Sequence, residues 1–115
     1  MIINGIELKW GMTIEIDKYD NFIVRDKQGN KIYLETSEGY WMKNKYDDKG
    51  NEIHFENSNC IWTKSEFDKN NNMVYYEDSS GFWKKMKYDE NSNMIYYKNS
   101  EGVIIDNRPK IELTL

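Results

Sequence analysis

Residues 46–66 read YDDKGNEIHFENSNCIWTKSE, and most of the remaining chain repeats this pattern. No insertion separates the copies, so the unit is 21 residues long throughout. A period of about twenty residues or more predicts a repeat array, in which each unit packs on its neighbours. We predict a single domain, residues 1–115, whose four repeats span residues 25–45, 46–66, 67–87 and 88–108.

Composition favours sheet over helix. Hydrophobic residues make up only 38% of the chain, but aromatic residues reach 15%, and each aromatic side chain can bury a large area. Tyr, Trp and Ile are typical strand residues. The predicted fold class is therefore all-β, an antiparallel meander of tandem β-hairpin repeats.

Each repeat contains two turn motifs. Asp-x-x-Gly-Asn stands at residues 26–30 and 47–51, and Asn71 and Ser92 take the place of its glycine in the later copies. The second motif, Asx or Thr followed by Ser-x-Gly, begins at residue 36 and recurs in every copy, with Cys60 replacing one glycine. Both motifs predict a type I turn followed by a residue with left-handed backbone.

The odd period constrains the two faces of the sheet. Side chains along a strand alternate with period two, so equivalent residues would change face from one repeat to the next. A longer loop or a β-bulge at the Asp-x-x-Gly-Asn turn would restore the alternation. We predict this compensation, which leaves one apolar face to be covered, either by curling of the sheet into an open barrel or by formation of a homodimer.

The opposite face carries the residues that we predict to form a binding surface. Trp, Tyr, Lys and Glu recur there, so lysines can pair with glutamates across strands or lie over aromatic rings. The predicted binding residues are Trp41, Trp62, Trp83, Tyr33, Tyr75, Tyr96, Lys43, Lys64, Lys85, Glu35, Glu56 and Glu77. His54 takes the tyrosine position in the second copy. Packing of these aromatic side chains on one another is the purely structural alternative.

The two ends depart from the repeat. Residues 1–24 are predicted to form an N-terminal cap, with an Asn-Gly turn at residues 4–5 and strands at 6–10 and 12–16 joined near Gly11. Residues 109–115 are predicted to form a C-terminal cap strand after Pro109.

The sequence offers little for catalysis or metal binding. One histidine and one cysteine stand at different repeat positions, which excludes the usual zinc spacings. The recurring serines and aspartates lie in turns, where their side chains close the turn. We expect no enzymatic activity, no catalytic residues, no metal and no cofactor.

Charge and cysteine content indicate the environment of the protein. A net charge of −4 disfavours direct nucleic-acid binding. A lone cysteine fits a reducing compartment, and the sequence shows neither a signal peptide nor an apolar membrane span. We therefore expect a cytoplasmic protein without membrane contact.

The repeat also resembles a known family. Its Asp-x-x-Gly-Asn-x-Ile-Tyr-Tyr unit, followed by Ser-x-Gly-x-Trp-x-Lys, is similar to tandem YD/MORN-2-like hairpin repeats over residues 25–108. YDDKGNEIHFENS and YDENSNMIYYKNS carry the resemblance, which extends to small repeat proteins of phages and mobile elements. Cys60, Asn71 and Ser92 depart from its glycine positions. A looser resemblance links the repeats to choline- and glucan-binding modules.

The resemblance implies a function that the residues alone do not specify. It implies a non-enzymatic protein-binding module, a phage-derived inhibitor that occludes a host defence nuclease complex in the manner of anti-CRISPR proteins. The expected partner is a protein, such as a host nucleic-acid-processing complex. The alternatives are a small-ligand or glycan-binding aromatic repeat module and an antitoxin or immunity protein.

Overall fold

The computed structural model describes residues 2–3 and 5–110. Within these residues the chain is all β, without helix. Its strands are β1 (Ile2–Ile3), β2 (Ile6–Glu7), β3 (Thr13–Ile16), β4 (Phe22–Arg25), β5 (Lys31–Glu35), β6 (Trp41–Tyr46), β7 (Glu52–Asn57), β8 (Trp62–Phe67), β9 (Met73–Asp78), β10 (Trp83–Tyr88), β11 (Met94–Asn99) and β12 (Ile104–Asp106).

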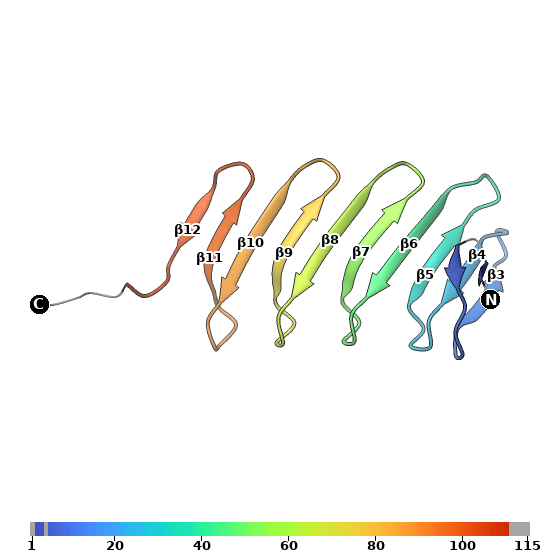
Figure 1. The fold of residues 1–115 in the computed structure, drawn as a ribbon, viewed down its shortest axis with the longest axis horizontal. Helices are drawn as coiled ribbons and strands as arrows, with labels where there is room; N and C mark the ends of the chain where they lie inside the picture. Colours follow the sequence, from blue (N-terminus) through green and yellow to red (C-terminus); the bar gives the residue numbers. More distant parts are fainter. Residues whose placement is uncertain (1, 4, 111–115) are drawn as a thin grey trace, which may run out of the picture.

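Strands β3 to β12 form one antiparallel sheet in which each strand pairs with its neighbours in the sequence. Figure 1 shows these strands as a single row that runs from blue to red. Strands β3 and β12 lie at opposite edges, and the molecule measures 69 × 29 × 24 Å. The predicted meander of hairpin repeats is confirmed, and the sheet stays open rather than closing on itself.

Both turn motifs form loops of the same length. The Asp47 amide donates to the Asn51 carbonyl at 2.9 Å, and the Gly50 amide donates to the Asp47 carbonyl at 3.1 Å. The second motif shows the same pair of bonds, for example in the turn that begins at Thr36. The predicted left-handed positions are confirmed, including the non-glycine residues Cys60 at φ 63°, Asn71 at φ 65° and Ser92 at φ 63°.

A β-bulge beside each Asp-x-x-Gly-Asn turn restores the face alternation. Between β6 and β7, Lys45 pairs with His54 but Tyr46 pairs with Glu52, so Ile53 is the extra residue. The same register shift recurs between β4 and β5, β8 and β9, and β10 and β11. Because both loops have equal length, this bulge is the step that keeps equivalent residues on one face, as the odd period predicted.

Aspartate side chains hold the same row of turns together. Asp47 Oδ1 accepts bonds from the backbone amides of Asn51 and Lys49, and these bonds hold the pKa of its carboxyl below the usual range. Adjacent turns are also joined, because Asn51 Nδ2 donates to Asn71 Oδ1 at 2.9 Å and Asn72 Nδ2 donates to Ser92 Oγ at 3.0 Å. The two residues that replace glycine therefore bridge neighbouring repeats.

The N-terminal segment differs from its prediction. Residues 6–10 and 12–16 do not pair with each other; β2 pairs with β1. Gly5, at φ 80°, lies in the tight turn between β1 and β2, whereas Gly11, at φ 88°, lies in a separate turn before β3. Trp10 therefore lies in a turn and is fully exposed. Both glycine turns therefore form, but only the predicted turn at Gly5 joins two paired strands.

Burial is strongest near the N-terminal end of the sheet. Val24 is 0% exposed, Tyr33 3% and Ile23 4%. The hairpin β1–β2, dark blue in Figure 1, overlaps this end of the sheet in the view, and Ile6 and Glu7 line a hollow together with Ile32 and Lys43. At the other end, β12 is exposed and stops at Asp106, and residues 107–110 form no strand. Most of the predicted C-terminal cap strand, residues 111–115, lies outside the described residues.

Candidate functional site

Cross-strand register places the predicted binding residues on one face of the sheet. Trp41 pairs with Glu35, and Lys43 pairs with both Tyr33 and Glu56. Directly paired residues share a face, and the pattern continues through β11. We name this surface the Trp–Lys face; its residues are Tyr33, Glu35, Trp41, Lys43, Lys45, His54, Glu56, Trp62, Lys64, Glu66, Tyr75, Glu77, Trp83, Lys85, Lys87, Tyr96 and Lys98.

A lysine lies over each tryptophan ring of this face. The Nζ atom lies 5.1 Å from the ring centroid for Lys43 and Trp41, 5.3 Å for Lys64 and Trp62, and 5.4 Å for Lys85 and Trp83. Residues two apart along a strand point to the same side, which brings each pair together. Cation–π contacts at such exposed sites stabilise by about 0.5–1 kcal/mol. The contacts therefore orient the lysines more than they stabilise the fold.

The N-terminal end of the Trp–Lys face is covered. Tyr33 is buried, with the Phe22 ring packed edge-on at a centroid distance of 6.2 Å. A Cβ atom at Gly5 would lie 3.8 Å from Lys43 Nζ, which places the turn of the β1–β2 hairpin beside that lysine. The side chains open to a partner therefore lie farther along the sheet, where Trp62 and Trp83 are half-buried and Lys64 and Lys85 exposed.

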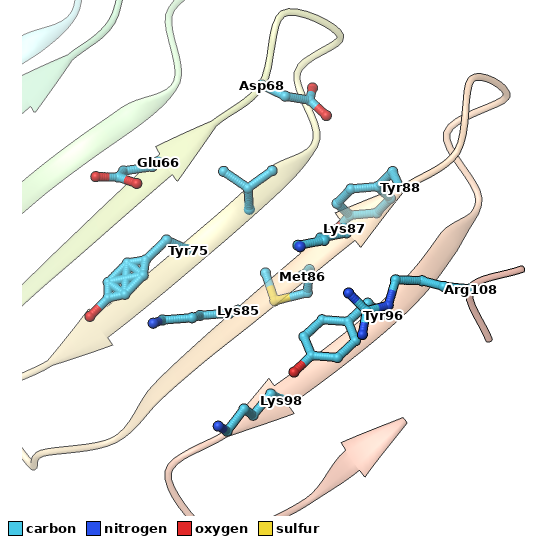
Figure 2. A pocket seen from close by; sticks show the side chains of 11 residues that line it. Glu66, Asp68, Tyr75, Lys85, Met86, Lys87, Tyr88, Tyr96, Lys98 and Arg108 are labelled. Carbon is cyan, nitrogen blue, oxygen red and sulfur yellow. The ribbon is translucent and has the colours of Figure 1, made fainter. Parts of the chain in front are cut away.

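A hollow of about 750 Å³ lies at the C-terminal end of the Trp–Lys face. Figure 2 shows Lys85 and Lys87 from β10, with Tyr96 and Lys98 from β11, around this hollow. Tyr75 also lines it, and burial together with Glu77 raises the pKa of the Tyr75 hydroxyl. The hydroxyl donates to Glu77 Oε2 at 3.3 Å.

Arg108, which follows the last strand, closes one side of the hollow. Its guanidinium carbon lies 4.4 Å from the Tyr96 ring centroid, and Lys87 Nζ lies 5.7 Å from the same centroid. Arg108 also pairs with Asp106 at 2.8 Å, and its hydrogen bonds lower the pKa of that carboxyl to about 2. This ion pair fixes the arginine against the ring.

Sequence reasoning did not include Lys87, Lys98 and Arg108 among the binding residues. The signal for Lys98 was present in the sequence, because Lys98 stands where the first three repeats carry glutamate. Lys87 could also have been included, because it follows Lys85 by two residues and side chains two apart on a strand share a face. Nothing in the repeat pattern indicates that Arg108 returns to Tyr96.

The opposite face is less apolar than predicted. Its aromatic residues include Tyr76, which packs on Phe82 at a centroid distance of 6.3 Å and lies beneath Lys84 Nζ at 5.5 Å. Asn57 and Asn99 are buried on this face among the rings. This face therefore carries polar as well as apolar side chains, and whether curling or dimerisation covers it stays a prediction.

The described residues offer no candidate metal centre. In the described residues no three His, Cys, Asp or Glu side chains gather closely enough to hold a metal ion. His54 lies in β7 and Cys60 is exposed in a turn. Among residues 2–3 and 5–110 no helix could cross a membrane. No protein-family model and no curated protein matches the sequence.

Proposed function

We propose that this protein is a non-enzymatic binding module and that its Trp–Lys face docks on a partner protein. The observation that carries the proposal is the row of half-buried tryptophans, each with a lysine over its ring, on one face of an open sheet. Trp and Tyr are enriched at protein interfaces and contribute most of their binding free energy.

The geometry also favours binding by lowering its entropic cost. Backbone pairing on both sides fixes the β8 and β10 strands that carry Trp62 and Trp83. Lys64 and Lys85 already lie against those rings before any partner arrives. A preordered side chain loses less rotamer freedom on binding, so more of its contact energy becomes affinity.

Within this proposal the protein acts in the cytoplasm as an inhibitor of a host defence nuclease complex. The resemblance to phage YD/MORN-2-like repeat proteins supports this step. The acidic turns support it too, because Asp47, Asp68 and Asp89 lie in equivalent turns of successive hairpins, at the same end of their strands. Such a row is complementary to a basic nucleic-acid groove, so the inhibitor occludes that groove without taking part in chemistry.

Affinity capture tests the proposal. The immobilised protein should recover a defined protein from a host lysate, and the double variant W62A/W83A should lose it. The matched control is T63A/K84A, whose residues lie on the same strands but on the opposite face. Equal capture by wild type and W62A/W83A would refute the proposal, as would recovery of no protein.

Oligosaccharide binding is the second candidate, because half-buried rings in a row can also stack on sugars. Cationic ligands such as choline are disfavoured, since Lys64 and Lys85 already occupy the ring positions that a cation would take. Titration with oligosaccharides while tryptophan fluorescence is recorded separates the two candidates. A saturable change with a sugar, combined with no protein capture, would favour this second function.

A further inference from the structure

The charge pattern of the Trp–Lys face breaks at its C-terminal end. Lys43 stands opposite Glu56, and Lys64 stands opposite Glu77. At the equivalent position of the last repeat, Lys85 stands opposite Lys98. Like charges directly opposite each other destabilise a strand pair. The last repeat therefore has an unfavourable Lys–Lys pair at the position where the preceding repeats have a favourable Lys–Glu pair.

Two further cations surround this pair. Lys87 follows Lys85 on the same face of β10, roughly 7 Å along the strand. Arg108 lines the same hollow from the segment after β12. In the part of the chain that the structure describes, no carboxylate lies within ion-pair distance of Lys85, Lys87 or Lys98. Asp106 lies opposite Tyr96 and attracts Lys87, but its ion pair is with Arg108.

We propose that this lysine cluster (Lys85, Lys87 and Lys98) binds an acidic, extended segment of the partner protein. The inference rests on the proposed function and names the part of the partner that docks at this end. Acidic residues at alternate positions of an extended segment are spaced roughly 7 Å apart, which matches the spacing of Lys85 and Lys87. Their carboxylates offset the repulsion between Lys85 and Lys98, so binding relieves a strain that the free protein carries.

A nucleic acid fits the same cations less well. The hollow ends at Glu66 and Asp68, so a long polyanion would leave the lysines and meet carboxylates. Arg108 and Lys87 already lie against the Tyr96 ring, which restricts base stacking there. The net charge of −4 opposes it further. A short acidic peptide can stop before Glu66 and Asp68 and needs no stacking surface, and its smaller charge meets less of the long-range repulsion.

A peptide titration tests the inference. The probe is a fluorescein-labelled peptide of alternating Glu and Ser, with a Gln–Ser peptide as the uncharged control and a labelled oligothymidylate as the nucleic-acid probe. We expect the Glu peptide to bind and to weaken as salt rises from about 0.05 M to about 0.5 M. K98E should weaken binding by roughly tenfold, and K84E, on the opposite face of β10, should leave it unchanged.

Thermal unfolding of the same variants adds a second readout. K98E restores the Lys–Glu pairing of the other repeats, so it should be at least as stable as wild type while binding less. E77K, which copies the lysine pair into the preceding repeat, should be less stable and bind the Glu peptide more tightly. Loss of binding in K98E through unfolding would appear as a lower melting temperature.

Several results would overturn the inference. These are no binding of the Glu peptide, equal binding of the Gln peptide, equal effects of K98E and K84E, or tighter binding of oligothymidylate than of the Glu peptide. If the Glu peptide fails while W62A/W83A still abolishes partner capture, the proposed function stands and this inference falls. If the peptide binds while that variant captures normally, the proposed function falls instead.

Discussion

Ser79 and Trp62 form a reciprocal pair that joins two neighbouring repeats. The Ser79 amide donates to the Trp62 carbonyl at 3.0 Å, and the Trp62 amide donates to Ser79 Oγ at 3.2 Å. Ser58 and Ser100 bind Trp41 and Trp83 in the same way. Each of these serine hydroxyls therefore binds the tryptophan backbone of the preceding repeat. The sequence had indicated only that the serines close their own turns.

Replacing this serine should weaken the joint between repeats. In S79A the Trp62 amide loses its acceptor, and we expect the free energy of unfolding to fall by about 0.5–1.5 kcal/mol. Urea denaturation followed by circular dichroism measures the change. The matched control is S80A, at the next loop position, whose hydroxyl contacts only its own turn. An unchanged urea midpoint for S79A would show that the pair contributes nothing.

Cys60 carries backbone strain that glycine would relieve. Its φ of 63° is left-handed and its side chain is exposed, so C60G removes strain without removing a buried contact. We expect C60G to stabilise the protein by about 0.5–1 kcal/mol. G81A at the equivalent position should destabilise by about 1 kcal/mol. A Cβ there meets nothing within 4 Å, so the cost comes only from the left-handed backbone conformation. A melting temperature that moves the same way in both variants would contradict this account.

Acid should unfold the row of aspartate turns. Backbone amides bind the carboxylates of Asp47, Asp68 and Asp89 and lower their pKa values below 3.8. In this range the unfolded chain binds protons more readily than the folded chain. The stability that these lowered pKa values contribute is fully present above about pH 3.8 and disappears as the pH falls through the folded pKa values. Melting temperatures recorded from about pH 6 to about pH 2.5 should therefore drop over the lower part of that range.

A triple variant provides the control for the acid prediction. D47N/D68N/D89N keeps a carbonyl oxygen for the backbone amides but removes the titrating groups. It should be less stable than wild type at neutral pH and lose less stability on acidification. A pH profile as steep as that of wild type would assign the acid sensitivity to other carboxyl groups.

Removing one complete repeat should shorten the sheet without destroying it. Deletion of residues 67–87 joins Glu66 to Tyr88, the residue equivalent to Phe67. Contacts run between consecutive strands, so the remaining hairpins keep their neighbours. We expect a folded β protein whose longest dimension decreases by roughly 10 Å, two strand spacings, in small-angle X-ray scattering. An unfolded product would indicate that the array is not built from nearest-neighbour contacts.

The repeat and its turn chemistry predicted the fold because both depend on local rules. The positions of Gly50 and Asn51 give a turn, and the odd period requires a bulge such as the one at Ile53. The turn at Gly5 was predicted in the same way, but the prediction that residues 6–10 pair with residues 12–16 was wrong. Gly5 and Gly11 both form turns, and the glycines alone do not indicate which of the two turns joins paired strands.

The candidate site was predicted only in part, for a related reason. The face that carries Trp62 and Lys64 follows from strand alternation. The opposition of Lys85 and Lys98 depends on the register of two strands, and the approach of Arg108 to Tyr96 depends on the path of an irregular segment. Departures from the repeat, such as lysine in place of glutamate, mark this end of the face.

The most direct test compares two adjacent lysines on opposite faces of β10. Lys84 lies 5.5 Å from the Tyr76 ring and Lys85 lies 5.4 Å from the Trp83 ring, so K84E and K85E remove equivalent contacts. Isothermal titration of each variant with the captured partner measures the effect. Docking through the Trp–Lys face predicts that K85E weakens binding by roughly tenfold or more while K84E binds like wild type. A loss in K84E equal to or greater than the loss in K85E would contradict it.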